Sequence, residues 1–381
     1  MISFELSEIQ EQIKDTAKKF AQEEIAPSVI ERDINAEYPA EIIKKLGELG
    51  FLGIMTDPQW GGSGLDAVSY VLAMEEISKV DASVGIIVSV QNSLVNWILE
   101  NYGSDEIKEK YLKPLAEGTK IGAFCLSEPE AGSDATQQHT TAVRSGDKWI
   151  LNGMKNWISS GQNADLNIVF AHANQELGYK GINCYVVEKG TKGWEPQKKE
   201  DKMGMRSSDT CSIAIENCEV PHANLVGKEG DGFYIAMQSL NGGRMGIASQ
   251  AVGIAMGALE KSVQYAKERK AFGKPIAQHQ MIQEKLANMA TKISAAHNLV
   301  LYAAWLKDQH INYTRASAEA KLFAASTAME VTRDAIQIHG GYGYVREYHV
   351  ERMLRDAKVT EIYEGTSEIQ KIVIARDLTR D

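Results

Sequence analysis

The 381-residue sequence is poor in cysteine and proline and carries no excess of positive charge. Its four cysteines form no CxxC pair and lie far from metal-finger spacing, so we expect buried thiols in a reducing compartment and no metal site. The eight prolines argue against long disordered linkers. The 41 basic and 51 acidic residues give a net charge of −10, which argues against a general nucleic-acid or anionic-membrane binder. A local basic pocket for a phosphorylated ligand stays open.

Long uninterrupted hydrophobic runs are also absent. The N-terminus alternates charged with apolar residues and has no signal-peptide apolar core. The most apolar stretch, around Ile86 to Leu99, is interrupted by Gln91, Asn92 and Asn96, so we expect no membrane-spanning segment. The prediction is a soluble, cytoplasmic protein.

Hydrophobic periodicity divides the sequence into three parts, in line with a length of more than two typical domains. The pattern predicts a helical domain over residues 1–120. Apolar residues share one helix face near the N-terminus, at Ile9, Ile13, Ala17 and Phe20. Further helices are expected over 39–49, over 67–79 with Asp66 or a neighbour as the cap, and over about 104–117.

The period changes in residues 121–230, which we expect to form a β domain. Short segments rich in Val, Ile, Tyr and Trp are separated by turn residues, at 147–153, 166–172, 182–188 and 210–216. Strands at such intervals, without helices between them, predict a compact β domain or barrel rather than βαβ units.

Helical periodicity returns in residues 231–381. Apolar residues step by three and four from Ile282 to Ala303, as on one stripe of a long helix, and 315–338 reads as a second, alanine-rich helix. Small residues let helices approach closely, which favours a bundle. The predicted fold class is therefore mainly α with a central β domain.

Four regions are not explained by the core pattern: FCLSEPEAGSDA (124–135), KNWISSG (155–161), ERKAFGKPIAQHQ (268–280) and the pair QIHGGYGY (337–344) and IYEGTSEIQ (362–370). Each alone has an ordinary explanation, such as an Asx turn, a core tryptophan, a solvated cationic helix end or a surface carboxylate. Thr366 or Ser367 is expected to cap the last helix, with Glu368 at a capping-box-like position.

Taken together and in this order, these segments resemble the acyl-CoA dehydrogenase family of flavoproteins over essentially the whole chain. The segments SVQNSL (89–94), GYKGI (178–182), GRMGIASQ (243–250) and TEIYEGTSEIQ (360–370) are most similar to short-chain (butyryl-CoA) and short/branched-chain members. The resemblance implies an N-terminal helical domain, a middle β-barrel domain and a C-terminal four-helix bundle. It further implies FAD between the β domain and the bundles, a homotetramer, and an electron-transferring flavoprotein as electron acceptor.

The reaction implied is the α,β-dehydrogenation of an acyl-CoA to a trans-2-enoyl-CoA. Glu364 matches the catalytic base, which removes the α-proton while the β-hydrogen leaves as hydride to flavin N5. The positions that match FAD contacts are Phe124, Leu126, Ser127, Ser133, Trp157, Ile158, Ser159, Arg269, Phe272, Gln280, Gln337, Gly341, Thr366 and Glu368. Those from Arg269 to Gly341 would reach the FAD across the subunit interface. The positions that match substrate contacts are Ser133, Arg244, Gly365 and Arg376.

The sequence departs from the family pattern at two places near the implied CoA site. Glu130 stands where many relatives have glycine, and Asn241 to Gly243 precede Arg244 where relatives often have an acidic residue. A short acyl chain is expected because the helix over 89–99, with the bulky Trp97 and Ile98, should close the floor of the pocket.

Three alternatives stay open: an acyl-CoA oxidase, an enoyl-CoA reductase with a bifurcating flavoprotein partner, and a non-catalytic helical interaction module. Oxidases of this fold usually carry a longer C-terminal half, so the length of 381 residues favours a dehydrogenase. The presence of Glu364 and of the Arg269 segment argues against a non-catalytic module.

Overall fold

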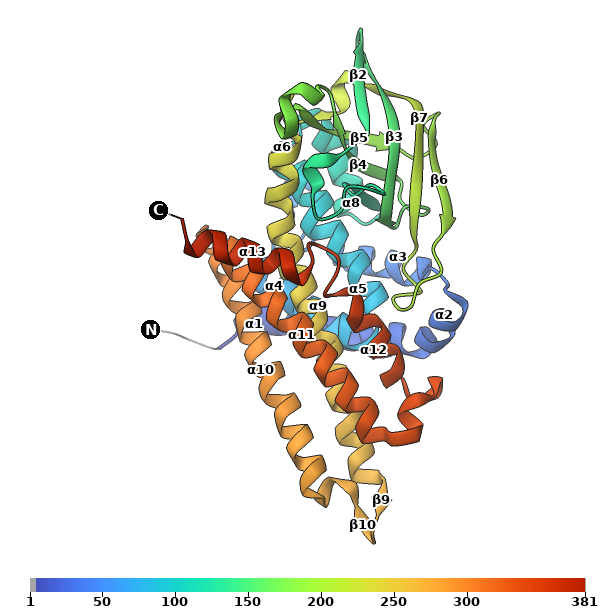
Figure 1. Ribbon diagram of the computed structural model, residues 1–381, viewed down its shortest axis with the longest axis vertical. Helices are drawn as coiled ribbons and strands as arrows, with labels where there is room; N and C mark the ends of the chain where they lie inside the picture. The colour runs from blue at the N-terminus through green and yellow to red at the C-terminus, as the bar shows by residue number, and fades with distance from the viewer. Residues whose placement is uncertain (1–4, 381) are drawn as a thin grey trace.

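The computed structural model describes residues 5–380 and has the predicted order of helices, strands and helices. The sheet lies at one end of the long axis, and the hairpin of β9 (Lys270–Ala271) and β10 (Lys274–Pro275) lies at the other (Figure 1). The fold class is confirmed, whereas the boundaries at 120/121 and 230/231 stay predictions.

The N-terminal part is helical throughout. Its α-helices are α1 (Glu8–Phe20), α2 (Val29–Asn35), α3 (Ala40–Glu48), α4 (Ala67–Val80), α5 (Ala82–Ser89), α6 (Trp97–Tyr102), α7 (Asp105–Ile107) and α8 (Lys113–Ala116). Asp66 caps α4 as predicted, since its side chain accepts a hydrogen bond from Ser69 N. The helix expected over 104–117 consists of α7, a π-helical turn and α8.

The stretch Ala82–Tyr102 is long and apolar enough to cross a membrane by length and composition, with a mean hydropathy of 1.4. In the structure, 94% of its most apolar 18-residue window is buried inside the protein. Its polar side chains tie it to neighbouring backbone: Asn92 donates to Phe51 O at 2.9 Å and Asn96 donates to Leu52 O at 2.8 Å. This burial favours a core helix, and the absence of a membrane span stays a prediction.

The central β domain contains every predicted strand. The strands are β1 (Gly122–Cys125), β2 (Thr141–Ser145), β3 (Lys148–Ser159), β4 (Leu166–His172), β5 (Ile182–Glu188), β6 (Trp194–Lys199), β7 (Thr210–Pro221) and β8 (Leu225–Val226). They pair in the order β6-β7-β3-β2-β4-β5-β8, and β1 lies parallel to β4. Within the described residues no pairing joins β6 to β8, so the ladder is an open one rather than a closed barrel.

The four cysteines are all buried and free, as their spacing predicts. Cys125, Cys211 and Cys218 belong to the core of the β domain, whereas Cys184 belongs to the main core. They act there as small apolar side chains.

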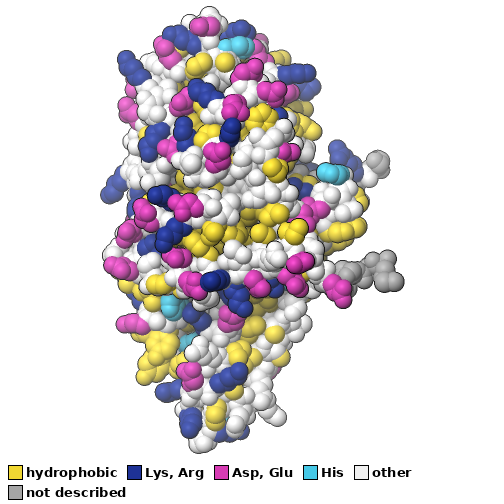
Figure 2. Space-filling view, turned by 180° about the vertical axis from the view of Figure 1, so that it is seen from behind, with side chains coloured by type: hydrophobic (Ala, Val, Ile, Leu, Met, Phe, Trp, Pro, Cys, Tyr) yellow, Lys and Arg dark blue, Asp and Glu magenta, His cyan; other side chains and the backbone are white. Residues whose placement is uncertain are grey.

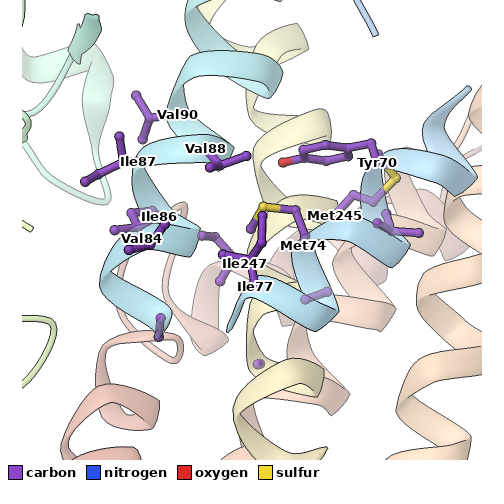
Figure 3. Close-up of a cluster of buried hydrophobic side chains, with 14 of the residues drawn as sticks. Tyr70, Met74, Ile77, Val84, Ile86, Ile87, Val88, Val90, Met245 and Ile247 are labelled. Carbon is purple, nitrogen blue, oxygen red and sulfur yellow. The ribbon is translucent and has the colours of Figure 1, made fainter. Parts of the chain in front are cut away.

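The C-terminal part is a bundle built on one long helix. Its helices are α9 (Gly232–Glu268), α10 (Gln280–Asp308), α11 (Thr314–His339), α12 (Val350–Val359) and α13 (Ser367–Leu378). The first three pack against one another, and α4 packs against α9 and α10. Figure 3 shows the shared core, where Tyr70 and Met74 of α4 lie near Met245 and Ile247 of α9. The N-terminal helices and the bundle therefore meet along α9, where Arg244 lies.

Candidate active site

Glu364 lies in the turn between α12 and α13, in a left-handed backbone conformation. Its φ is +54°, and the next residue, Gly365, has a φ of +86°. A left-handed glutamate is disfavoured by contact of its Cβ with the backbone, so the surrounding structure must hold it. Thr366 ends the turn as the N-cap of α13, since its hydroxyl accepts from Ile369 N at 3.3 Å. Glu368 is the second residue of α13 and is exposed, whereas a capping box would use the third.

Two buried side chains hold this turn through its main-chain carbonyls. Lys321 Nζ of α11 donates to Gly365 O at 2.5 Å. Gln370 Nε2 of α13 donates to Gly365 O at 2.8 Å and to Glu364 O at 3.2 Å. Because both side chains are buried, they fix the direction in which the Glu364 carboxylate points.

The Glu364 carboxylate lies against α9, close to Gly243. Its Oε2 atom is buried and has no hydrogen-bond partner among the described residues. A Cβ placed on Gly243 would lie 2.6 Å from that oxygen and 3.1 Å from Leu94 Cδ2, so glycine lets the carboxylate keep this position. Burial raises the pKa of Glu364 to about 7, against the charges of Lys321 and Arg244, which lower it. A carboxylate of this kind can accept a proton near neutral pH.

Arg244 lies on α9 beside this carboxylate and is itself buried. It donates to Asn241 Oδ1 at 2.7 Å, and its Nε has no partner within the described residues. Burial lowers the pKa of Arg244, and the Glu364 carboxylate acts in the opposite sense. An orphaned guanidinium N–H in a buried site is a donor free for a ligand.

The other two predicted substrate residues lie apart from this group. Arg376 is exposed on α13, ten residues after Thr366, which places it about 15 Å further along the helix axis. Ser133 is exposed in the loop between β1 and β2.

The predicted FAD residues of the β domain come together at the end of β1. Lys155 Nζ reaches Leu126 O at 3.2 Å, Glu128 Oε1 at 2.7 Å and Gln138 Oε1 at 2.9 Å. Asn156 N donates to Ser127 O at 2.9 Å. These bonds join the segment of Phe124, Leu126, Ser127 and Ser133 to the segment of Trp157, Ile158 and Ser159.

Trp157 is not the core residue that a strand-end tryptophan usually is. Its side chain is 62% exposed, and its φ of +60° turns it out of the strand, while the neighbouring Ile158 is buried. An exposed indole held in this way offers a flat face to an aromatic ligand.

The remaining predicted FAD residues form a second surface at the far end of the bundle. Arg269 and Gly341 line a cavity of about 500 Å³ together with Tyr265 and Tyr342. The Arg269 guanidinium lies 5.7 Å from the Tyr342 ring centroid, and a Cβ on Gly341 would meet no atom within 4 Å. Phe272 of the β9–β10 hairpin is 96% exposed. Gln280 at the start of α10 and Gln337 near the end of α11 are also exposed.

A single chain presents these FAD positions as two separate surfaces. Arg269 follows Arg244 by 25 residues along α9, which corresponds to about 37 Å. The far surface combines a cation, an open glycine backbone and aromatic rings, and these groups fit the phosphates and rings of a dinucleotide.

Figure 2 shows hydrophobic side chains gathered in patches across the middle and lower part of one face, among charged side chains of both signs.

Sequence reasoning assigned no role beside Glu364 to Lys321, Gly243 or Gln370, and the first two carry a signal. Lys321 stands on the buried stripe of α11, between alanines at 318, 325 and 328, where a charged residue is unexpected. Gly243 stands in a run of small residues on a buried helix face, which is typical of close approach. Nothing in the pattern indicated Gln370.

Three sequence profiles match nearly the whole chain: "Acyl-CoA dehydrogenase, N-terminal domain" over residues 7–119, "middle domain" over 123–218 and "C-terminal domain" over 230–379. A short-chain specific acyl-CoA dehydrogenase of Clostridium acetobutylicum is 46% identical over 100% of both chains. Acryloyl-CoA reductase (NADH) of Anaerotignum propionicum is 46% identical over 100% of this chain and 96% of its own.

Solved structures agree closely in fold. Butyryl-CoA dehydrogenase of Megasphaera elsdenii superimposes with a TM-score of 0.98 at 45% identity, over 100% of both chains. A chain from a structure described as "Electron transferring flavoprotein of Acidaminococcus fermentans: Towards a mechanism of flavin-based electron bifurcation" has a TM-score of 0.99 at 51% identity, again over 100% of both chains. With all three domains present over its full length, this chain belongs to the acyl-CoA dehydrogenase family of FAD-dependent oxidoreductases.

Proposed function

We propose that this protein catalyses the FAD-dependent α,β-dehydrogenation of a short-chain acyl-CoA to the trans-2-enoyl-CoA, with Glu364 as the base. The observation that carries the assignment of the base is that one oxygen of the Glu364 carboxylate is buried without a hydrogen-bond partner among the described residues. Burial also raises the pKa of Glu364 to about 7. A general base works best when its pKa lies near the working pH, because it is then both ionised and basic.

The chain supplies the groups that move the proton and stabilise the charge. Glu364 Oε2 takes the proton from the carbon next to the thioester, at a place that Gly243 and Leu94 adjoin. The backbone N–H of Glu364 donates to no acceptor within the described residues, so it can bind the thioester oxygen as negative charge grows there. The free Nε of Arg244 is a further donor for the substrate.

FAD supplies the hydride acceptor when it is bound. The residues that would hold it are the joined segments of Leu126 and Trp157 in the β domain, and Arg269 and Gly341 of a second copy of the chain. Thr366 and Glu368, at the start of α13, are proposed to contact its adenosine-diphosphate half within the same subunit. The separation of the two surfaces supports a homotetramer in which copies complete one another's sites.

A short acyl chain is supported by the named relatives and by the residues around the base. Leu94 lies beside Gly243 and Glu364, and Trp97 lines a cavity of about 630 Å³ that also reaches Asn241. Ile98, the second residue expected at the floor, is buried and does not line that cavity. Activity measured over a series of acyl lengths tests the assignment, and faster turnover of twelve-carbon than of four-carbon substrates would refute it.

A second candidate is the reverse reaction, reduction of an enoyl-CoA. It is favoured by the likeness to acryloyl-CoA reductase (NADH) and to the chain from the bifurcating flavoprotein structure. The same Glu364, protonated, would return the proton. To distinguish the two directions, two rates are compared. One is the rate with acyl-CoA and an oxidised electron-transferring flavoprotein, and the other is the rate with enoyl-CoA and the reduced form of that flavoprotein.

The four buried free cysteines also support the cytoplasm as the location.

The proposed function is tested by anaerobic titration of the purified protein with butyryl-CoA while the flavin absorbance is followed. Bleaching is expected in the wild type. Glu364→Gln is expected to keep its FAD and to bind the CoA thioester, but to lose most of its turnover, because an amide takes up no proton. Unchanged turnover in this variant would exclude Glu364 as the base, and oxygen consumption with acyl-CoA would indicate an oxidase.

A further inference from the structure

The buried lysine under the Glu364 turn has no role in the function proposed so far. Lys321 is 1% exposed on α11, and its only hydrogen bond in the described part of the chain goes to the main-chain oxygen of Gly365. A buried ammonium is usually paired with a carboxylate, because an unpaired charge is costly away from water. Within the described residues, no carboxylate lies within 4 Å of Lys321 Nζ.

The positive charge of Lys321 nevertheless acts on the carboxylate of the proposed base, Glu364. Burial lowers the pKa of Lys321 to about 8, and the opposing charge that acts on it most strongly is Glu364, ahead of Glu361 and Glu368. In return, Lys321 is the group that most strongly lowers the pKa of Glu364 against burial, followed by Arg244. The Glu364 charge also acts on Tyr70 of α4 and Tyr363 of the turn, and burial raises the pKa of both, so they stay neutral.

The hydrogen bond and the charge act on one short segment. Glu364 and Gly365 are consecutive left-handed residues, and Lys321 binds the carbonyl of the second. Gln370 binds the same carbonyl and is neutral, so it can share the task of holding the turn but not that of stabilising an anion. Arg244 has the charge but binds Asn241 instead of the turn. Of Lys321, Gln370 and Arg244, only Lys321 both binds the turn and carries a positive charge.

We propose that Lys321 is a positioning residue of the reaction. It holds the left-handed Glu364–Gly365 turn through the Gly365 carbonyl, and its positive charge favours the ionised form of the Glu364 carboxylate, whose Oε2 atom is buried without a hydrogen-bond partner in the described part of the chain. The inference rests on the proposed role of Glu364 as the base.

The test is the pH dependence of kcat/KM for butyryl-CoA, which a purely structural role would not shift. In Lys321→Met the acid-side midpoint is expected to move upward by roughly one pH unit, because an opposite charge near a carboxylate changes its pKa by at least that much. At one pH unit below the wild-type midpoint, this corresponds to a loss of about tenfold. Lys321→Arg keeps the charge and is expected to keep the wild-type midpoint.

The matched control is Lys261→Met, which removes the same charge from a partly buried lysine on α9. Lys261 follows Arg244 by 17 residues, or about 25 Å of helix, so the midpoint should stay where it is. Should Lys321→Met not fold as a flavoprotein, Lys321→Gln removes the charge while leaving a donor for the turn, and the same shift is expected.

Two failures are distinguishable. A wild-type midpoint in a folded, flavin-loaded Lys321→Met or Lys321→Gln enzyme overturns the role of Lys321, while the loss of turnover in Glu364→Gln still stands. Retained turnover in Glu364→Gln overturns the base itself, whatever the lysine variants do.

Discussion

At the scale of single residues, the chemistry depends on how the buried carboxylate of Glu364 stays able to ionise near neutral pH. Burial raises the pKa of Glu364 to about 7, while the positive charges of Lys321 and Arg244 act to lower it. The backbone conformation is equally forced, since a left-handed glutamate needs support from neighbouring elements.

The pKa of Glu364 gives a direct expectation for the pH profile. Only the ionised carboxylate can take a proton, so kcat/KM should rise with pH, with a midpoint near the pKa of about 7. The measurement is the initial rate in buffers that span this value, with flavin content checked at each pH. A flat profile through this range, or a rate that falls with rising pH, would contradict the assignment.

Gly243 offers a test of the space around the carboxylate. In Gly243→Ala the new methyl group would lie 2.6 Å from Glu364 Oε2, and the flexible carboxylate would swing away more easily than the helix would move. Turnover is expected to fall roughly a hundredfold, because a displacement of about 1 Å can have that effect. The free energy of unfolding should stay near the wild-type value, since alanine is favoured over glycine in a helix by up to about 1 kcal/mol.

The control is Gly242→Ala on the same helix, where the nearest atom to the new methyl group is the Ser93 carbonyl oxygen at 3.3 Å. Both variants gain the same helix propensity, and they differ in the atom that the new methyl group approaches. Equal turnover in both would show that the carboxylate does not need this space.

At the scale of elements, the sequence predicted most helices and strands because their hydrophobic periods are regular. The strands over 166–172 and 182–188 coincide with β4 and β5, and the stripe from Ile282 to Ala303 lies on α10. The helix expected over 89–99 is present, but the π-helical conformation of Val90–Asn96 was not predicted, because sequence periodicity does not mark such a turn. The open ladder of the β domain was not predicted either, since strand periodicity does not determine which edges pair.

The candidate site was predicted from motifs, and residues outside motifs escaped. Glu364, Arg244 and Gly365 lie together in the structure as the family resemblance implies, and the roles assigned to them stay predictions. Lys321 shows in the sequence only as a charge on an apolar stripe, and Gln370 ends the segment IYEGTSEIQ without an assigned role. Their contact with the turn depends on how α11 and α13 pack, which the sequence pattern does not reveal.

The junction between β1 and β3 depends on the buried pair of Lys155 and Glu128. Burial acts to raise the pKa of Glu128, but the Lys155 ammonium outweighs it and the pKa lies below its usual value. Removing one partner leaves a buried charge uncompensated, so Lys155→Met should lower the free energy of unfolding by roughly 3–5 kcal/mol. Chemical denaturation of the flavin-loaded protein measures this.

The double variant Lys155→Met with Glu128→Leu removes both charges and should recover a large part of that loss. Because the pair holds Leu126 O and Gln138, the single variant should also release FAD more readily. A single variant as stable as the wild type would show that the pair does not hold the loop.

At the scale of the whole molecule, one chain separates its cofactor residues by most of the length of α9. Trp157 belongs to the β domain at one end of the molecule, and Arg269 precedes the β9–β10 hairpin at the other end (Figure 1). The helix from Arg244 to Arg269 is about 37 Å long. A cofactor that needs both surfaces can be completed only when copies of the chain pack with these surfaces facing each other. The exposed Phe272 and the open Gly340–Gly341 backbone are then interface features rather than solvent-facing ones.

Arg269→Ala tests this arrangement, because the residue lies far from the chemistry of its own chain. If its guanidinium holds the FAD of a second copy, the variant should show a lowered flavin-to-protein ratio and a shift from tetramer to smaller species, measured by absorbance and by analytical ultracentrifugation. Added FAD should restore both together, since cofactor binding and assembly would be linked. Lys270→Ala, which removes a neighbouring exposed charge from the same hairpin, should stay tetrameric and fully flavinated. An Arg269→Ala enzyme that retains full FAD content as a tetramer would place the cofactor within one chain and leave the far surface without this role.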